Sequence, residues 1–144
     1  MIRSEIVKAE HLSAIAEIER ECFSEPWSEE ALGLFVREGA FGVIVSYNGE
    51  IGSYCTVLQA LDEAQIINVA TRSELRGRGL ARATVERVIE ECKKRNIVSV
   101  SLEVRRSNVA AISLYEALGF CVCGERRGFY KDPREDALIM IKEI

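Results

Sequence analysis

Residues suited to binding an anion are concentrated in one segment of the chain. In order, they are Arg76, Gly77, Arg78, Gly79, Leu80, Ala81 and Arg82. The apolar run before this segment, 64–71, predicts a strand, and the apolar spacing after it predicts a helix. Unpaired N–H groups in the first turn of a helix, together with the helix dipole, attract anions. This order of strand, loop and helix therefore predicts a pyrophosphate site.

The segment by itself does not identify the molecule that carries the phosphate. Gly77 and Gly79 let the backbone approach phosphate oxygens where a Cβ would intrude. The Gly-Lys-Ser/Thr ending of a Walker loop is missing, and Arg82 stands where a dinucleotide fingerprint needs its third glycine. From the segment alone, a glycine-rich turn with solvated arginines is an equal alternative.

The elements that must position this segment alternate between helical and strand periodicity. Helices are predicted over about 10–22, from Ser28 to just before Gly39, from about Gly79 to Cys92, and over 109–118 after a cap at Ser107 or Asn108. Strands are predicted near Ile6, over 41–47 and 51–59 around the hairpin turn Asn48-Gly49, and over 64–71, 97–104, 120–125 and 136–143. The order predicts a mixed α/β fold, and we expect one domain over 1–144.

Composition limits the classes of partner. The 144 residues are 48% hydrophobic and 29% charged, which is enough apolar content for a packed core and unlike a disordered chain. The formal net charge of −4 gives no general attraction to nucleic acid or to anionic membranes. No apolar stretch approaches a membrane span, and the first residues lack the apolar region of a signal peptide. We expect a cytoplasmic protein.

The cysteines predict neither disulfides nor a metal site. The five are Cys22, Cys55, Cys92, Cys121 and Cys123. An odd number scattered through apolar patterns predicts reduced side chains in the core. Cys121 and Cys123 would share one face of a strand, but no second Cys/His pair is present to complete a metal site. We therefore expect no metal.

Two linked motifs resemble the GNAT family of N-acetyltransferases. Arg76–Ala81 resembles the family's R/Q-x-x-G-x-G/A loop, and Asn108–Phe120 resembles its coenzyme A motif N-x-x-A-x-x-L-Y-E-x-x-G-F. The resemblance implies a twisted mixed central sheet with helices on both faces. It also implies that the strands ending near Thr71 and Glu103 splay apart, with acetyl-CoA bound as cosubstrate in that gap.

More narrowly, nearly the whole chain is similar to the RimI-type alanine N-acetyltransferases, which modify a small-subunit ribosomal protein. The segments that carry this similarity are Pro26–Glu29, Leu61–Ala64, Ser101–Arg105, Arg126–Tyr130 and Arg134–Met140. The similarity implies acetyl transfer to the N-terminal amine of a protein, with the alanine terminus of a ribosomal protein as the expected acceptor. We expect a monomer or weak dimer that contacts neither nucleic acid nor membrane directly.

The resemblance also implies which residues bind the cosubstrate. The backbone of Val69, Ala70 and Thr71 would pair with the pantetheine arm, and an N–H near Val69 or Ala70 would face the oxyanion. The segment 76–82 would hold the pyrophosphate, and Asn108 would contact the pantetheine. Most of this binding would come from the backbone.

By the same resemblance, Glu103 is the proton acceptor and Tyr115 the proton donor. A phenol of reference pKa about 10 can protonate a thiolate whose thiol lies near 8.5. An α-amine with a reference pKa near 8 needs a weaker base than a lysine near 10.4, which is consistent with N-terminal acetylation. Without the resemblance, Tyr115 fits a core tyrosine, and Glu103 an ion-pair partner of Arg105 or Arg127.

The acceptor side leaves alternatives open. Trp27 and Tyr130 would line a peptide slot, although Trp27 also fits packing between the first two helices. The same chemistry on a polyamine, amino sugar or amino acid is a second hypothesis. A third is a coenzyme A-binding partner subunit without turnover, against which the presence of Glu103 and Tyr115 argues.

Overall fold

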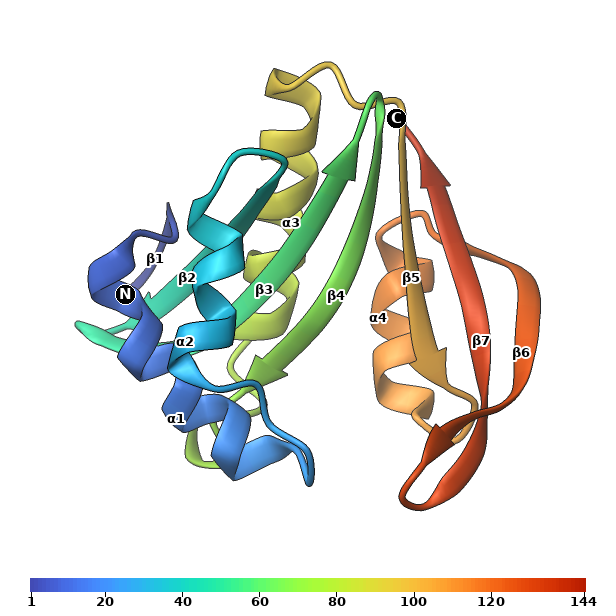
Figure 1. The fold of residues 1–144 in the computed structure, drawn as a ribbon, viewed down its shortest axis with the longest axis horizontal. Helices are drawn as coiled ribbons and strands as arrows, with labels where there is room; N and C mark the ends of the chain where they lie inside the picture. The colour runs from blue at the N-terminus through green and yellow to red at the C-terminus, as the bar shows by residue number, and fades with distance from the viewer.

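A computed structural model describes residues 1–144 and has the predicted α/β architecture (Figure 1). Its strands are β1 (Ile2–Ile6), β2 (Ala40–Tyr47), β3 (Glu50–Ala60), β4 (Glu63–Thr71), β5 (Ser99–Arg105), β6 (Cys121–Lys131) and β7 (Arg134–Glu143). Its α-helices are α1 (Leu12–Cys22), α2 (Glu29–Leu32), α3 (Leu80–Lys94) and α4 (Val109–Ala117), with 3-10 turns η1 (Ala9–His11), η2 (Gly33–Val36) and η3 (Ser73–Leu75). The strands form one sheet in the order β1-β2-β3-β4-β5-β7-β6. Only the β4–β5 pair is parallel, so the sheet is mixed.

Local signals placed the turns and caps correctly. The hairpin between β2 and β3 turns at Asn48 and Gly49, whose φ angles are +51° and +89°, as the Asn-Gly pair predicts. Ser28 caps α2, since its Oγ accepts the N–H of Ala31 at 3.1 Å. Asn108, and not Ser107, caps α4, because its Oδ1 accepts the N–H of Ala111 at 3.2 Å.

Helices cover both faces of the sheet because adjacent strand residues point to opposite sides. In β2, Val43 and Val45 pack into a core with α3 and α4, whereas Ile44 between them packs into a second core with α1 and α2. Burying each large aliphatic side chain contributes about 1.5–3 kcal/mol. Two cores on one sheet therefore hold the helices that flank the predicted site. None of these helices has the length and apolar composition needed to cross a membrane.

The sheet opens between β4 and β5, as the family resemblance implied. The two strands pair at only three positions, Glu63 with Ser99, Ala64 with Val100 and Gln65 with Ser101. Beyond these pairs the strands diverge towards their carboxyl ends (Figure 1). The facing edges of both strands thus offer backbone N–H and C=O groups that no neighbouring strand uses.

The prediction that all five cysteines lie in the core is wrong for Cys121 and Cys123. Both are exposed, because β6 forms the edge of the sheet and most of its side chains face solvent. Cys55 and Cys92 are buried, and Cys22 is half-buried. Burial raises the pKa of Cys92 to about 11, so this thiol stays protonated at neutral pH. All five cysteines are free thiols, as predicted.

Candidate active site

The arginine- and glycine-rich segment forms a turn that opens α3. Gly77 and Gly79 have φ angles of +79° and +81°, a region that L-residues with a side chain rarely adopt. The first backbone bond of the helix runs from the N–H of Ala83 to the carbonyl of Gly79 at 3.1 Å. The N–H groups of Gly77, Arg78 and Gly79 donate no hydrogen bond within the protein. These donors are therefore available to an anion at the positive end of the helix dipole.

The glycine turn borders a cavity. A cavity of about 210 Å³ is lined by Thr71, Leu75, Arg76, Gly77, Gly79, Leu80, Ala81, Arg82 and Leu114. A Cβ added at Gly77 or Gly79 would meet no atom within 4 Å, so both positions border open space. Glycine is therefore favoured at both positions because of the positive φ angle, and not because a Cβ would clash with a neighbour.

The arginines of the turn already have partners in the protein. Arg76 Nε lies 3.4 Å from the carbonyl of Thr71, and the Arg78 guanidinium lies 5.1 Å from the centre of the Tyr47 ring. Arg82 pairs with Glu86 on the next turn of α3 at 3.4 Å. The backbone N–H groups of the turn have no partner, and the arginines add a positive field around them.

The predicted pantetheine-binding residues Val69, Ala70 and Thr71 form the end of β4, on the edge that β5 leaves open. Two hydroxyls that the sequence did not single out support this strand end. Ser53 Oγ donates to the carbonyl of Ala70 at 2.9 Å and accepts from Thr71 Oγ1 at 3.1 Å, while Thr84 Oγ1 lies 3.0 Å from Ser53 Oγ. Both Ser53 and Thr84 are fully buried. A buried hydroxyl network thus orients the last residues of β4.

Glu103 extends from β5 into the gap, with its side chain 15% exposed. The alternative of an ion pair with Arg105 or Arg127 is wrong in its partner, which is Arg126. Gln65 donates to Oε1 at 3.2 Å, and Arg126 Nε lies 3.0 Å from Oε2. Arg105 is instead held by Glu135, which lies on β7 beside it.

One oxygen of Glu103 lacks a well-formed hydrogen bond. Oε2 forms an ion pair with Arg126 but accepts no well-formed hydrogen bond, and it is buried. Buried acceptors are normally satisfied, and an exception needs a reason. An amine or a water placed in the gap would satisfy this oxygen.

Tyr115 combines core packing with an accessible hydroxyl. The residue is 7% exposed, and its ring packs against Phe120 with centroids 5.7 Å apart. The hydroxyl makes no hydrogen bond within the protein. It is not fully buried, so it reaches solvent. Burial raises the pKa of Tyr115, so the phenol is protonated throughout the physiological range.

Glu103, Tyr115 and Tyr130 interact electrostatically. Burial and the Glu103 carboxylate raise the pKa of Tyr130, and Tyr130 in turn contributes to the raised pKa of Tyr115. The Tyr130 ring is held from one side by the Arg105 guanidinium, 4.3 Å from its centre.

Trp27 lies on the segment between α1 and α2. Its ring packs against Phe35, with centroids 5.3 Å apart, which agrees with the packing alternative. Its backbone N–H donates to Glu19 at 2.8 Å. Glu19 was missed, although its position on the inner face of α1, four residues after Ile15, was a usable signal. No group of three or more His, Cys, Asp or Glu side chains is arranged to hold a metal ion.

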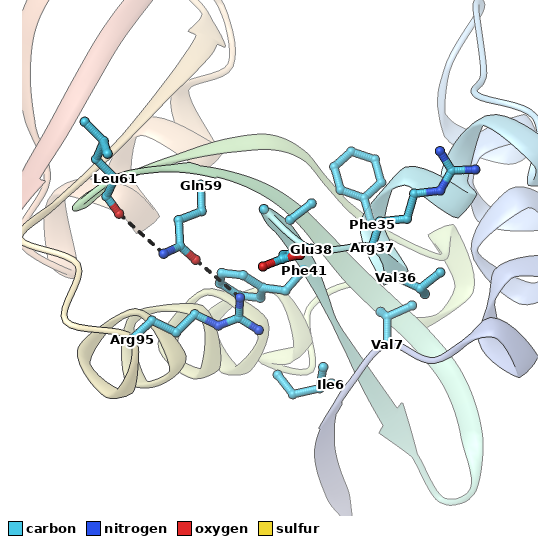
Figure 2. Close-up of a pocket in the computed structure, with 12 residues that line it drawn as sticks. Ile6, Val7, Phe35, Val36, Arg37, Glu38, Phe41, Gln59, Leu61 and Arg95 are labelled. Atoms are coloured by element: carbon cyan, nitrogen blue, oxygen red, sulfur yellow. Dashed lines mark hydrogen bonds between the residues drawn. The ribbon is translucent and has the colours of Figure 1, made fainter.

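A larger cavity of about 610 Å³ lies elsewhere (Figure 2). It is bordered by Phe41, Gln59 and Arg95, the last of which follows the carboxyl end of α3. None of the predicted site residues lines it. The helix is 15 residues long and separates this cavity from the glycine turn by about 22 Å. Size therefore does not identify the site here, whereas the unpaired donors and the open strand edges do.

Comparisons with known proteins agree with this geometry. Residues 12–120 match the family described as acetyltransferase (GNAT). The chain is similar to the ribosomal protein bS18 alanine N-acetyltransferase of Escherichia coli (strain K12), at 39% identity over 92% of this chain and 91% of the relative. It is 33% identical to the putative enzyme of the same description from Bacillus subtilis (strain 168), over 93% and 90% of the two chains. The crystal structure of the Escherichia coli ribosomal-protein-alanine N-acetyltransferase matches with a TM-score of 0.92 at 36% identity, covering 100% of this chain and 94% of that one.

Proposed function

The chain belongs to the acetyltransferase (GNAT) family, and on this premise we propose that it acetylates the N-terminal alanine of ribosomal protein bS18. It is an acetyl-CoA-dependent N-acetyltransferase. The observation that carries the choice of acceptor is the 39% identity, over nearly the whole chain, to an enzyme described as acting on that alanine. The acceptor is thus the α-amine of a protein, and the enzyme works in the cytoplasm as one domain, as a monomer or weak dimer.

The cosubstrate lies along the open edge of β4 in this proposal. Acetyl-CoA supplies an activated acetyl thioester when bound. The N–H groups of Gly77, Arg78 and Gly79 hold the pyrophosphate, since they are unpaired at the start of α3. Val69 to Thr71 bind the pantetheine arm through the strand edge, and an N–H there faces the thioester oxygen. The side-chain NH₂ of Asn108 is a free donor for the same arm, because only its oxygen is used in capping α4.

Glu103 accepts the proton of the acceptor amine. It lies on β5 at the splayed strand ends, and its Oε2 accepts no well-formed hydrogen bond from the protein. About a tenth of α-amines are already neutral at pH 7, so one carboxylate is a sufficient base for them. A lysine would require a stronger base, which favours the terminal amine as acceptor.

Tyr115 gives a proton to the sulfur as the C–S bond breaks. Its hydroxyl is accessible and donates its proton to no acceptor within the protein. Burial raises the pKa of Tyr115, so the phenol carries the proton until the thiolate forms. Tyr130 and Trp27 line the acceptor slot on its two sides.

Transfer of isotopically labelled acetyl to two matched hexapeptides tests the proposed function. One peptide begins with a free alanine and has no lysine, and the other is blocked at its N-terminus and has one lysine. We expect mass spectrometry to find the label only on the free terminus. The bS18 N-terminal peptide should then be acetylated faster than a peptide of the same composition in scrambled order. Label on lysine alone, or on neither peptide with acetyl-CoA bound, would contradict the proposal.

A further inference from the structure

One buried carboxylate has no part in the proton transfers described above. Glu19 lies on α1 and is 0% exposed, among apolar neighbours such as Ile15 and Ile18. No arginine or lysine pairs with it. Burying a charged group without a counter-charge is costly unless hydrogen bonds compensate. An apolar side chain would fill this position without that cost. The hydrogen bonds of Glu19 therefore indicate a role beyond filling the core.

Three donors from three separate elements converge on Glu19. Oε1 accepts the backbone N–H of Trp27 at 2.8 Å, in the segment between α1 and α2. Oε2 accepts the side-chain amide of Asn68 on β4 at 2.9 Å and the hydroxyl of Tyr54 on β3. Burial and the Glu19 carboxylate raise the pKa of Tyr54, so this phenol stays protonated and donates. Glu19 thus joins an irregular segment to two strands of the sheet.

The Asn68 end of this network lies in an irregular part of β4. The β3–β4 register shifts at Thr56, so β4 carries one extra residue, Ile67, immediately before Asn68. Asn68 is further tied by its own N–H, which donates to Thr56 Oγ1 at 3.2 Å. Bulges beside active sites re-aim the residues that follow. The residue that follows here is Val69, the first of the strand end proposed to bind the thioester.

The Trp27 end of the network lies beside the same strand end. The last residue of α1, Cys22, has its sulfur 3.5 Å from the carbonyl of Thr71. Glu21 accepts the backbone N–H of Ser73, just beyond β4, at 2.8 Å. The segment from Phe23 to Ser28 therefore leaves α1 next to the open edge of β4. Its only hydrogen bond to the Glu19 side chain is made by the backbone N–H of Trp27.

We propose that Glu19 is a positioning residue for acetyl transfer, which fixes the α1–α2 segment and the bulged end of β4 relative to each other. This rests on the proposed function, since the first of these regions borders the acceptor and the second the thioester. A displacement of about 1 Å between reacting groups can lower a rate about a hundredfold. One carboxylate that holds both regions makes their spacing independent of either substrate.

Glu19→Met tests the proposal, because methionine keeps the volume of the side chain and removes all three hydrogen bonds. We expect kcat/KM for the alanine peptide to fall about a hundredfold, with the acetyl-CoA dissociation constant within about threefold of wild type. Amide hydrogen exchange should accelerate in 23–28 and 66–71 and stay unchanged in α3. Glu19→Gln should recover most of the activity, because its amide can accept from Trp27 and donate to a flipped Asn68 side chain.

Val88→Ala is the matched control for stability, since Val88 is fully buried on α3 and outside the network. It should lower the unfolding temperature comparably while leaving kcat/KM near wild type. If Glu19→Met does not fold, Asn68→Ala removes one tie at a half-buried position and should lower kcat/KM about tenfold. The proposal requires both the faster exchange and the lower kcat/KM, and the absence of either overturns it. If wild type acetylates no peptide, the proposed function fails, while the exchange result still decides whether Glu19 fixes the two regions.

Discussion

The two ends of the gap between β4 and β5 differ in composition, since backbone groups form one end and side chains form the other. At the proposed cosubstrate end, one continuous segment from Val69 to Arg82 supplies a strand edge, a glycine turn and a helix start, with backbone N–H groups that have no partner. At the proposed acceptor end, side chains arrive from α1, β4, β5, α4 and β6, and contacts between side chains orient Glu19 and Glu103. The first end depends on backbone conformation, and the second depends on side-chain networks.

This difference predicts different consequences of substitution. A side chain removed at the acceptor end should change the rate of transfer and leave cosubstrate affinity nearly intact. A change of backbone conformation at the cosubstrate end should do the reverse, because donors that hold the pyrophosphate act in the ground state and the transition state alike. The predictions below separate the two ends.

Glu103→Gln should have the largest effect. We expect kcat/KM for the alanine peptide to fall about 10²- to 10³-fold, because the amide cannot accept the proton of the amine. Affinity for acetyl-CoA, measured by calorimetry, should change less than about twofold. Glu125→Gln is a control, since this exposed carboxylate on β6 also pairs with arginine but lies outside the proposed site. Equal losses of kcat/KM in both variants would show that the rate depends on the negative charge of a carboxylate and not on the position of Glu103.

Tyr115→Phe should lower kcat about tenfold to a thousandfold, because the ring packing against Phe120 is kept and only the proton donor is lost. Steady-state kinetics at saturating acetyl-CoA measures this. Acetyl-CoA affinity should again stay nearly constant. An unchanged kcat would remove Tyr115 from the mechanism and leave it as a core residue.

Gly79→Ala tests the other end. A left-handed backbone costs an L-residue roughly 1–2 kcal/mol, so we expect the acetyl-CoA dissociation constant to rise about 5- to 30-fold with kcat at saturation unchanged. Gly33→Ala is the matched control, because its φ is −57° and a Cβ there would meet nothing within 4 Å. That variant should bind acetyl-CoA as wild type does. A loss of kcat in Gly79→Ala would break the distinction between the two ends.

The smallest expected effect concerns stability in acid. Hydrogen bonds from Ser107, with support from Arg105, lower the pKa of Glu135 below its ordinary value of 4.5. A lowered pKa in the folded state stabilises the fold above pH 4.5, and this contribution disappears as the pH falls through the lowered value. Glu135→Gln should therefore reduce the unfolding temperature slightly at neutral pH and not at about pH 2. A difference that persists in strong acid would contradict this origin.

Prediction from sequence succeeded where the determinant is local. Asn48-Gly49 placed a hairpin turn, and the alternation of strand and helix patterns placed all four helices and predicted a mixed α/β fold. It failed where the determinant is the position of a strand in the sheet. Cys121 and Cys123 were expected in the core because their strand is apolar, but β6 is the edge strand.

The sequence by itself determined the glycine turn and its helix start, because positive φ angles and unpaired first-turn donors are properties of a few consecutive residues. Only the tertiary structure decided the partners of the acidic groups. Glu103 faces Gln65 and Arg126, and Glu19 binds Trp27, Tyr54 and Asn68, residues between 8 and 49 positions away in the chain. Such pairings depend on how strands and helices pack, which periodicity along the chain does not encode.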